Sequence, residues 1–266
     1  KTTVSVNLAL LAARTLNRRV SLYDCDVEVP NGELFIKPEI IKTIDVNLPL
    51  PEIDESKCVK CGKCAEICNF HSLVFFQKLK KILFFQNLCH CCGTCFELCP
   101  QKCIIEKPNK IGTIKIGVKE KLKFVSGELT TGEILAFAII KKIFKDMPED
   151  EISIIDAPPG TSCTVVQSVI NADKCVLVTE PTPFGLYDLK LAVKLLRKLN
   201  KDFSIIINKF EYENNIITEY CSAENIKISG RIPFDKNIAL KYSSGDTIID
   251  DSMYKTVFSD IMEQIL

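Results

Sequence analysis

The fold class follows from the segment Ile152-Ser-Ile-Ile-Asp156-Ala-Pro-Pro-Gly160. Its short apolar run ends at an acidic residue and a Pro-Pro-Gly turn, as a buried strand ends at the edge of a sheet. Two further short apolar runs, Cys175–Thr179 and Phe203–Ile207, flank a helical pattern over Leu186–Leu199. Short buried strands that alternate with helices predict a parallel sheet covered on both faces.

The rest of the chain extends this pattern and interrupts it once. Upstream we expect a helix over Lys1–Leu16 and a strand that begins at Val20 and ends at Asp24, and downstream a helix over Thr131–Phe144 that has Gly132 near its start. The proline-containing stretch Glu33–Asp54 predicts an irregular boundary, and a lysine-rich connection follows Pro108. The prediction is an α/β fold, a mostly parallel and doubly wound sheet, with a small α+β insert: residues 1–52, an insert at 53–108, and 109–266.

Composition excludes several classes of protein. Lys plus Arg equals Asp plus Glu at 34 each, and no basic run is present, so nucleic-acid binding is not expected. The longest apolar stretch, Ile134–Ile140, is too short to span a membrane. The C-terminal segment Tyr254–Leu266 is mildly amphipathic, but its polar face carries acidic residues rather than lysines. We therefore expect a cytoplasmic protein from a reducing, anaerobic environment.

Cysteines are concentrated in one block. Nine of the fourteen lie between Cys58 and Cys99, whereas a secreted disulfide scaffold would be short and would spread them along the chain. The block contains two runs of the form C-x2-C-x2-C-x3-C, the second of which is followed by Pro100. A zinc site uses four ligands, usually as two C-x2-C pairs, and does not explain two complete runs. The repeated spacing predicts two [4Fe–4S] clusters.

In this spacing, three cysteines of a run wrap one cluster and the fourth reaches across to the other. The first cluster is therefore assigned to Cys58, Cys61, Cys64 and Cys99, and the second cluster to Cys89, Cys92, Cys95 and Cys68.

The block resembles bacterial two-cluster ferredoxins over its whole length. It departs from them at Asn69, where a proline is usual, and at Cys91 and Cys103, which are additional thiols. Cys91 is interpreted as a bystander that could exchange with Cys92, and His71 and His90 as packing groups. Thiols outside the block are expected to pack as small hydrophobic side chains: Cys25, Cys163, Cys175 and Cys221.

Segments outside the block resemble, in order, the motifs of the MinD/ParA-type P-loop ATPases. Lys1-Thr2-Thr3 corresponds to the end of a phosphate-binding loop, Val20–Asn31 to the switch region, and 152–160 to the second acidic motif. The segments 178–185, Ile205–Lys209 and Gly230–Phe234 match later motifs of the family. The combination is similar to the subgroup that carries an inserted two-cluster ferredoxin domain.

The resemblance implies a role for each matching residue in binding ATP or ADP with Mg²⁺. Lys1 would neutralise phosphate charge, the hydroxyl of Thr2 and the carboxylate of Asp156 would hold Mg²⁺, Asp26 would activate the attacking water, and Asp24 would support the metal. The remaining expected nucleotide contacts are Thr3, Gly160, Asn208, Pro233 and Phe234. Taken from the residues alone, Asp156 is equally consistent with an ordinary strand end, and Asn208 with a turn cap. The family's first strand, loop glycines and second lysine would precede residue 1, so we expect the sequence to be a fragment.

Three functions remain open at this stage. The first is an ATPase that couples nucleotide hydrolysis to electron transfer between protein partners, as in the related nitrogenase iron protein, with the clusters beside the switch. The second is a carrier that assembles iron–sulfur or metal cofactors and delivers them to client proteins; the C-x2-C pair of carrier-type relatives is missing outside the block. The third is MinD/ParA-like positioning. Each implies an ATP-dependent homodimer or a heterodimer of paralogues.

Overall fold

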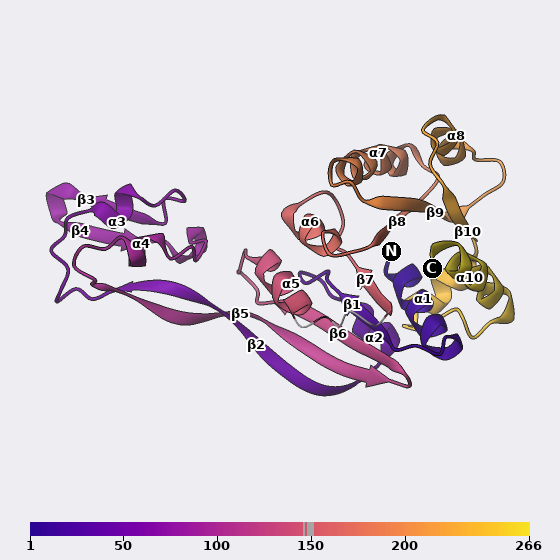
Figure 1. Cartoon of the computed structure of the whole chain (residues 1–266), viewed down its shortest axis with the longest axis horizontal. Helices are drawn as coiled ribbons and strands as arrows, with labels where there is room; N and C mark the ends of the chain where they lie inside the picture. Colours follow the sequence, from indigo (N-terminus) through magenta and orange to yellow (C-terminus); the bar gives the residue numbers. More distant parts are fainter. Residues whose placement is uncertain (146, 148–151) are drawn as a thin grey trace.

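Two sheets organise the computed structural model, which describes residues 1–145, 147 and 152–266 (Figure 1). The first has the strand order β2-β5-β6-β1-β7 and the second the order β10-β9-β8. Strands β6 and β7 run parallel to β1, and β8 and β10 run parallel to β9, but β5 is antiparallel to both β2 and β6. The first sheet is therefore mixed, whereas a mostly parallel sheet was expected, because β5 runs antiparallel to both of its neighbours and joins β6 through a tight turn. The strands are β1 (Val20–Asp24), β2 (Glu39–Ile53), β5 (Ile104–Lys119), β6 (Leu122–Leu129), β7 (Ile152–Asp156), β8 (Lys174–Thr179), β9 (Asp202–Phe210) and β10 (Ile228–Pro233).

Helices cover both faces of the first sheet, because side chains alternate between the faces along each strand. Leu22 of β1 and Phe124 of β6 join one buried cluster with α1 and α10, whereas Tyr23 and Val125, their neighbours in sequence, join another with α5. This confirms the expectation of a doubly covered α/β sheet. The helices are α1 (Thr2–Thr15), α2 (Gly32–Ile36), α5 (Ala136–Lys145), α6 (Cys163–Val169), α7 (Pro183–Lys198), α8 (Ile216–Ala223), α9 (Lys236–Ser243) and α10 (Ser252–Ile265).

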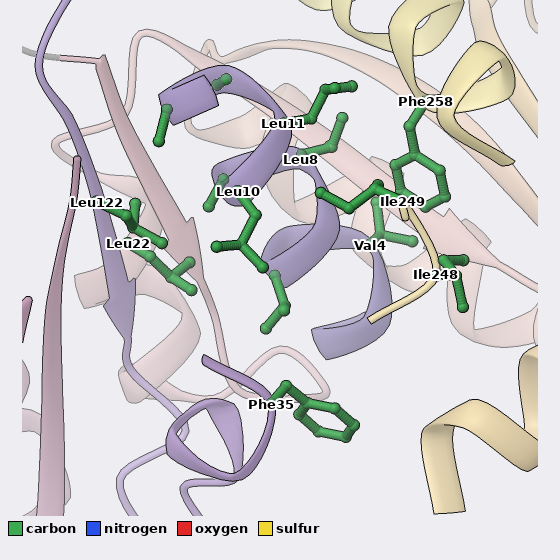
Figure 2. Close-up of a cluster of buried hydrophobic side chains, with 14 of the residues drawn as sticks. Val4, Leu8, Leu10, Leu11, Leu22, Phe35, Leu122, Ile248, Ile249 and Phe258 are labelled. Carbon is green, nitrogen blue, oxygen red and sulfur yellow. The ribbon is translucent and has the colours of Figure 1, made fainter. Parts of the chain in front are cut away.

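Helix α1 is the centre of the larger core (Figure 2). Its Val4, Leu8 and Leu11 side chains are at most 5% exposed, and burying a side chain of this size contributes about 1.5–3 kcal/mol. The buried amide of Asn7 accepts hydrogen bonds from the backbone N–H groups of Ile248 (2.9 Å) and Ile249 (3.2 Å). These bonds tie the C-terminal segment to α1 and so fix the position of the helix N-terminus.

The expectation of an irregular boundary over Glu33–Asp54 was wrong. Apart from the short α2, the stretch forms β2, which pairs with β5 from Glu39 to Ile53. Apolar residues alternate along it at Ile44, Val46 and Leu48, as in a half-buried strand. Its prolines are tolerated because β2 is an edge strand, whose outer side needs no N–H donors.

The lysine-rich connection was also predicted incorrectly, because β5 and β6 occupy it. Lysines of β5 form ion pairs with acidic residues, Lys107 with Glu52 and Lys110 with Asp45 (2.7 Å). Cross-strand pairs of opposite charge stabilise an antiparallel ladder, so the lysines favour the strand rather than a loop.

Beyond β6, β2 and β5 continue as a two-stranded ribbon that carries the cysteine block (Figure 1). Pairing with β6 ends at Gly112, so residues 47–53 and 104–110 extend alone over roughly 20 Å, at about 3.4 Å per residue. At its end lies the cysteine module, residues 54–103, in which Leu73 and Ile82 form a small core with the thiols and with Ile104, the first residue of β5. It contains α3 (Lys63–Glu66), β3 (Leu73–Phe76), η1 (Gln77–Leu79), β4 (Lys81–Phe84), η2 (Gln86–Leu88) and α4 (Thr94–Glu97). The domain boundaries at 52/53 and 108/109 remain predictions.

The remaining elements agree with expectation, differ at their ends, or were not predicted. The expected strands at 20–24, 152–155, 175–179 and 203–207 are confirmed as β1, β7, β8 and β9. Helix α5 begins at Ala136 rather than Thr131, because Gly132 has φ +90° and the chain before Leu135 forms a turn. Helices α6, α8 and α9 and strand β10 were not predicted.

Candidate functional site

Two acidic residues meet where neighbouring strands end. Asp24 and Asp156 are the last residues of β1 and β7 and are partners in the parallel register. Both are buried, at 1% and 5% exposure. The carboxylate of Asp24 accepts hydrogen bonds from the backbone N–H groups of Gly32 (2.8 Å) and Asp26 (3.2 Å). The sheet therefore brings the expected metal-shell acid and the expected Mg²⁺ ligand together.

Burial perturbs the proton affinity of Asp24 and of its neighbour Asp26. Desolvation raises the pKa of Asp24 to about 6, against the hydrogen bond from Gly32, and the charge of Asp156 raises it further. Burial also raises the pKa of Asp26, although Lys1 opposes the shift. The Oδ2 atom of Asp156 is buried and has no hydrogen-bond partner among the described residues. An unpartnered carboxylate oxygen beside a second acid fits a divalent cation and its water.

Lys1 supplies the positive charge at this edge. Its ammonium donates a hydrogen bond to the carbonyl of Ala157 (2.9 Å), directly after Asp156. Burial lowers the pKa of its side chain, and the charges of Asp156, Asp26 and Asp24 oppose that shift. Lys1 is also the N-cap of α1, whose positive dipole end favours anions. Thr2 and Thr3 follow as the first helical residues.

The expected adenine-side residues lie at the corresponding edge of the second sheet. Asn208 is half-buried near the end of β9. The Phe234 N–H donates to the carbonyl of Phe210 (3.1 Å), the last residue of β9, so Pro233 and Phe234 lie beside the end of this strand. Lys209 of β9 forms an ion pair at 2.9 Å with Glu180, which directly follows β8. Gly160, with φ +86°, lies in the turn after β7.

Sequence reasoning missed Gly32 as a part of this site. Its N–H holds Asp24, and a Cβ atom at this position would lie 2.9 Å from Asp24 Oδ2 and 3.2 Å from the Phe124 ring. The signal was present in the sequence, because a glycine follows Pro30-Asn31 at the end of the switch-like segment.

The cysteine module contains a cavity lined by cysteines from both runs. Cys68 of the first run faces it together with Cys89, Cys92 and Cys95 of the second. Among the described residues, no three His, Cys, Asp or Glu side chains are close enough to hold one metal ion. Each thiolate of a cubane binds a different iron, so these four cysteines around one cavity supply the kind and number of ligands that one cluster would need.

Of the other four cysteines of the runs, Cys58 and Cys99 contact a buried thiol outside the runs, Cys103. The Sγ atom of Cys103 is 3.5 Å from that of Cys99 and also forms a hydrogen bond with Cys58. Burial is the main cause that raises the pKa of Cys64. A hydrogen bond from the Ala65 N–H opposes this shift, and the charges of Cys58 and Cys61 add to it. These contacts associate Cys99 of the second run with cysteines of the first.

Hydrogen bonds favour the thiolate form of the fourth cysteine of each run. Burial opposes ionisation of Cys68, but hydrogen bonds from the Ser72 hydroxyl (3.2 Å) and nearby backbone N–H groups lower its pKa. The pKa of Cys99 is lowered in the same way, with Cys103 as the main donor against the effect of burial. Thiolates are the form that binds metal, so both side chains suit ligation.

The remaining thiols and histidines differ in their surroundings. Cys91 lines the cavity, and its N–H donates to Cys89 Sγ (3.4 Å). His90 stacks on Phe70 with ring centroids 3.7 Å apart, in agreement with a packing role. Cys25, Cys175 and Cys221 are buried as expected, but Cys163 is exposed at the start of α6, so the prediction that it packs as a hydrophobic side chain was wrong.

Paired strand-end acids beside a lysine at a helix N-terminus, on an α/β sheet of this topology, define a P-loop nucleotide-binding domain. The chain belongs to the family described as "CobQ/CobB/MinD/ParA nucleotide binding domain" (CbiA), which matches residues 1–248. The resemblance to MinD/ParA-type P-loop NTPases is thereby confirmed.

Similar proteins agree with this assignment. An uncharacterized protein of Methanocaldococcus jannaschii, MJ0579, is 30% identical over 275 residues, which cover 100% of this chain and 93% of that protein. The septum site-determining protein MinD of Pyrococcus horikoshii, solved with Mg-ADP, has a TM-score of 0.58 at 15% identity over 99% of this chain and 89% of its own. An iron-sulfur cluster carrier protein of Pyrococcus furiosus is 27% identical over 150 residues, 48% of this chain and 50% of that protein. No helix among the described residues is long and apolar enough to cross a membrane.

Proposed function

We propose that this chain is an ATPase that couples a nucleotide switch to electron transfer through two [4Fe–4S] clusters in an inserted ferredoxin-like domain. The observation that carries the proposal is the cavity shared by Cys68 and the second run, on a module attached to a P-loop domain. The crossed pairing of Cys68 and Cys99 is the arrangement expected for two-cluster ferredoxins. The clusters would accept and release single electrons between a protein donor and a protein acceptor.

In this proposal ATP or ADP is bound with Mg²⁺ by the body of the chain, which is the two sheets with their covering helices, without the cysteine module. Lys1 neutralises phosphate charge, Thr2 and Asp156 hold Mg²⁺ directly or through water, and Asp24 supports them from its buried position. Asp26 orients the water that attacks the γ-phosphate. Thr3, Gly160, Asn208, Pro233 and Phe234 surround the rest of the nucleotide, and the bound form is a homodimer or a heterodimer of paralogues.

The test is metal and nucleotide content of protein purified anaerobically. We expect about eight irons and eight sulfides per chain, four of each per cluster, and two interacting S = ½ centres on reduction. Cys221→Ser, a buried thiol outside the module, is the matched control and should retain all iron. Four irons or fewer, with zinc in their place, contradicts the cluster assignment, and failure to bind Mg-ATP contradicts the ATPase.

A carrier of iron–sulfur clusters is the second candidate. It is favoured by the similarity to carrier proteins of Aquifex aeolicus and Pyrococcus furiosus, although the chain spans only 30% and 50% of their lengths. Transfer to an apo-ferredoxin separates the two functions. Loss of iron to the acceptor in the presence of ATP supports a carrier, and retention of all iron supports electron transfer.

A further inference from the structure

A turn of the body is bonded directly to the predicted switch region. At the end of β6, just before this turn, the N–H of Leu129 donates to the carbonyl of Val27 (2.8 Å), which directly follows Asp26. The next residue, Thr130, donates to Ile111 of β5 (2.9 Å) and accepts from the N–H of Glu133 (3.0 Å). A displacement of the Asp24–Val27 segment would therefore move the turn that carries Glu133.

Asn109 connects this turn to the cysteine module. It lies on the ribbon opposite Leu48, and its Nδ2 donates to Glu133 Oε1 (3.0 Å) while its Oδ1 accepts from Gln86 Nε2 (3.4 Å). Gln86 begins η2, which ends directly before Cys89, the first cysteine of the second run. One amide side chain thus joins the body to the loop expected to hold the second cluster.

A packing contact also brings the body to the same loop. Cys91, between Cys89 and Cys92, lines the cavity and packs against the body's buried cluster that includes Leu135, two residues after Glu133. The Glu133 carboxylate, held by Asn109, therefore lies on the side of the body that this loop contacts.

We infer that Glu133, held by Asn109, is the group through which the nucleotide-binding body sets the reduction potential of the second cluster. This inference rests on the proposed function. A nearby negative charge disfavours the added electron and lowers the potential. Because the turn is bonded to Val27, nucleotide-dependent movement of the switch changes the distance between Glu133 and the cluster, and hence the potential.

The experiment is a redox titration of both clusters by electron paramagnetic resonance, without nucleotide and with Mg-ADP or Mg-ATP. Glu133→Gln should raise the reduced-to-oxidised ratio of the second cluster at least threefold at a fixed potential, about 28 mV at 59 mV per tenfold for one electron. The first cluster should change less. Asn109→Ala keeps the charge of Glu133 but removes the hydrogen bond that holds its carboxylate. This variant should therefore lose the nucleotide-dependent shift in the second-cluster potential that the wild type shows.

Glu120→Gln is the matched control, because it removes the same charge at the opposite end of the β5–β6 hairpin, where Glu120 pairs with Arg14. The inference is overturned if the second-cluster potential is unchanged in Glu133→Gln, or if it changes equally in Glu120→Gln. In either case the measured iron content and ATP binding leave the proposed function standing. A wild-type potential that ignores nucleotide overturns the coupling through this turn. A chain without iron overturns both.

Discussion

The body and the cysteine module build their sites in opposite ways. The body assembles Lys1, Asp24 and Asp156 from strands and a helix far apart in sequence, and it buries the acids. The module collects its cysteines from two short local runs, and leaves Cys61 and Cys92 exposed. A site made by a sheet depends on the whole fold, whereas a site made by local runs depends mainly on its ligands. Perturbations should therefore act globally in the body and locally in the module.

The largest effect should come from substituting the fourth cysteine of either run, Cys68 or Cys99. Cys68→Ser should remove the second cluster, which the other run mainly holds, and Cys99→Ser the first. Each variant should retain about four of eight irons, because the crossed pairing gives each run three ligands of its own cluster. Iron analysis and the number of paramagnetic centres check this. If Cys68→Ser removed the first cluster instead, or Cys99→Ser the second, each run would hold its own cluster with all four of its cysteines.

In the body, the largest effect concerns the buried carboxyl of Asp24. Its pKa of about 6 lies above the unfolded value of 3.8, so the folded state binds the proton more tightly and loses stability as pH rises from 3.8 to 6. Relative to Asp24→Asn, the wild type should lose about 2 kcal/mol of unfolding free energy between pH 4.5 and 7.5. Urea titrations without magnesium measure this. Parallel pH profiles of the two proteins would contradict it.

A smaller effect is expected at Gly32, which supports Asp24. The Cβ atom of Gly32→Ala would press on the Asp24 carboxylate and Phe124, at a cost of about 1–2 kcal/mol of unfolding free energy, and Mg-ATP affinity should fall with it. Gly132→Ala is the control, because its added Cβ meets open space and only its positive φ is strained. Calorimetric titration should show weakened nucleotide binding in the first variant and not in the second.

The same contrast explains what the sequence predicted. Strands β1, β7, β8 and β9 are short apolar runs that end in polar turns, and this local signal was sufficient. The ribbon was missed because its prolines and lysines resemble a loop until the partner strand is known: Pro49 pairs with Pro108, and Lys110 with Asp45. Such pairings join residues about sixty positions apart and have no local signature.

The candidate sites divide in the same manner. Spacing alone predicted the grouping of Cys68 with the second run, because each run is a local pattern. The clusters, in contrast, were expected beside the switch, whereas the ribbon carries the module away from the sheet and contact is made through Asn109 and Glu133. Neither residue belongs to a motif. Their proximity comes from the length and twist of the ribbon, which the sequence does not express.

The smallest predicted effect lies in the module, at Cys103. When Cys99 is a ligating thiolate, the thiol of Cys103 must be the donor across their 3.5 Å contact. A hydrogen bond to a ligand sulfur stabilises the reduced cluster, so Cys103→Ala should lower the potential of the first cluster, by less than about 59 mV. The second cluster of the same molecule serves as the internal control in a redox titration. Equal shifts of both clusters would mean that the substitution loosens the whole module, and then even this part of the chain would not be governed by local contacts.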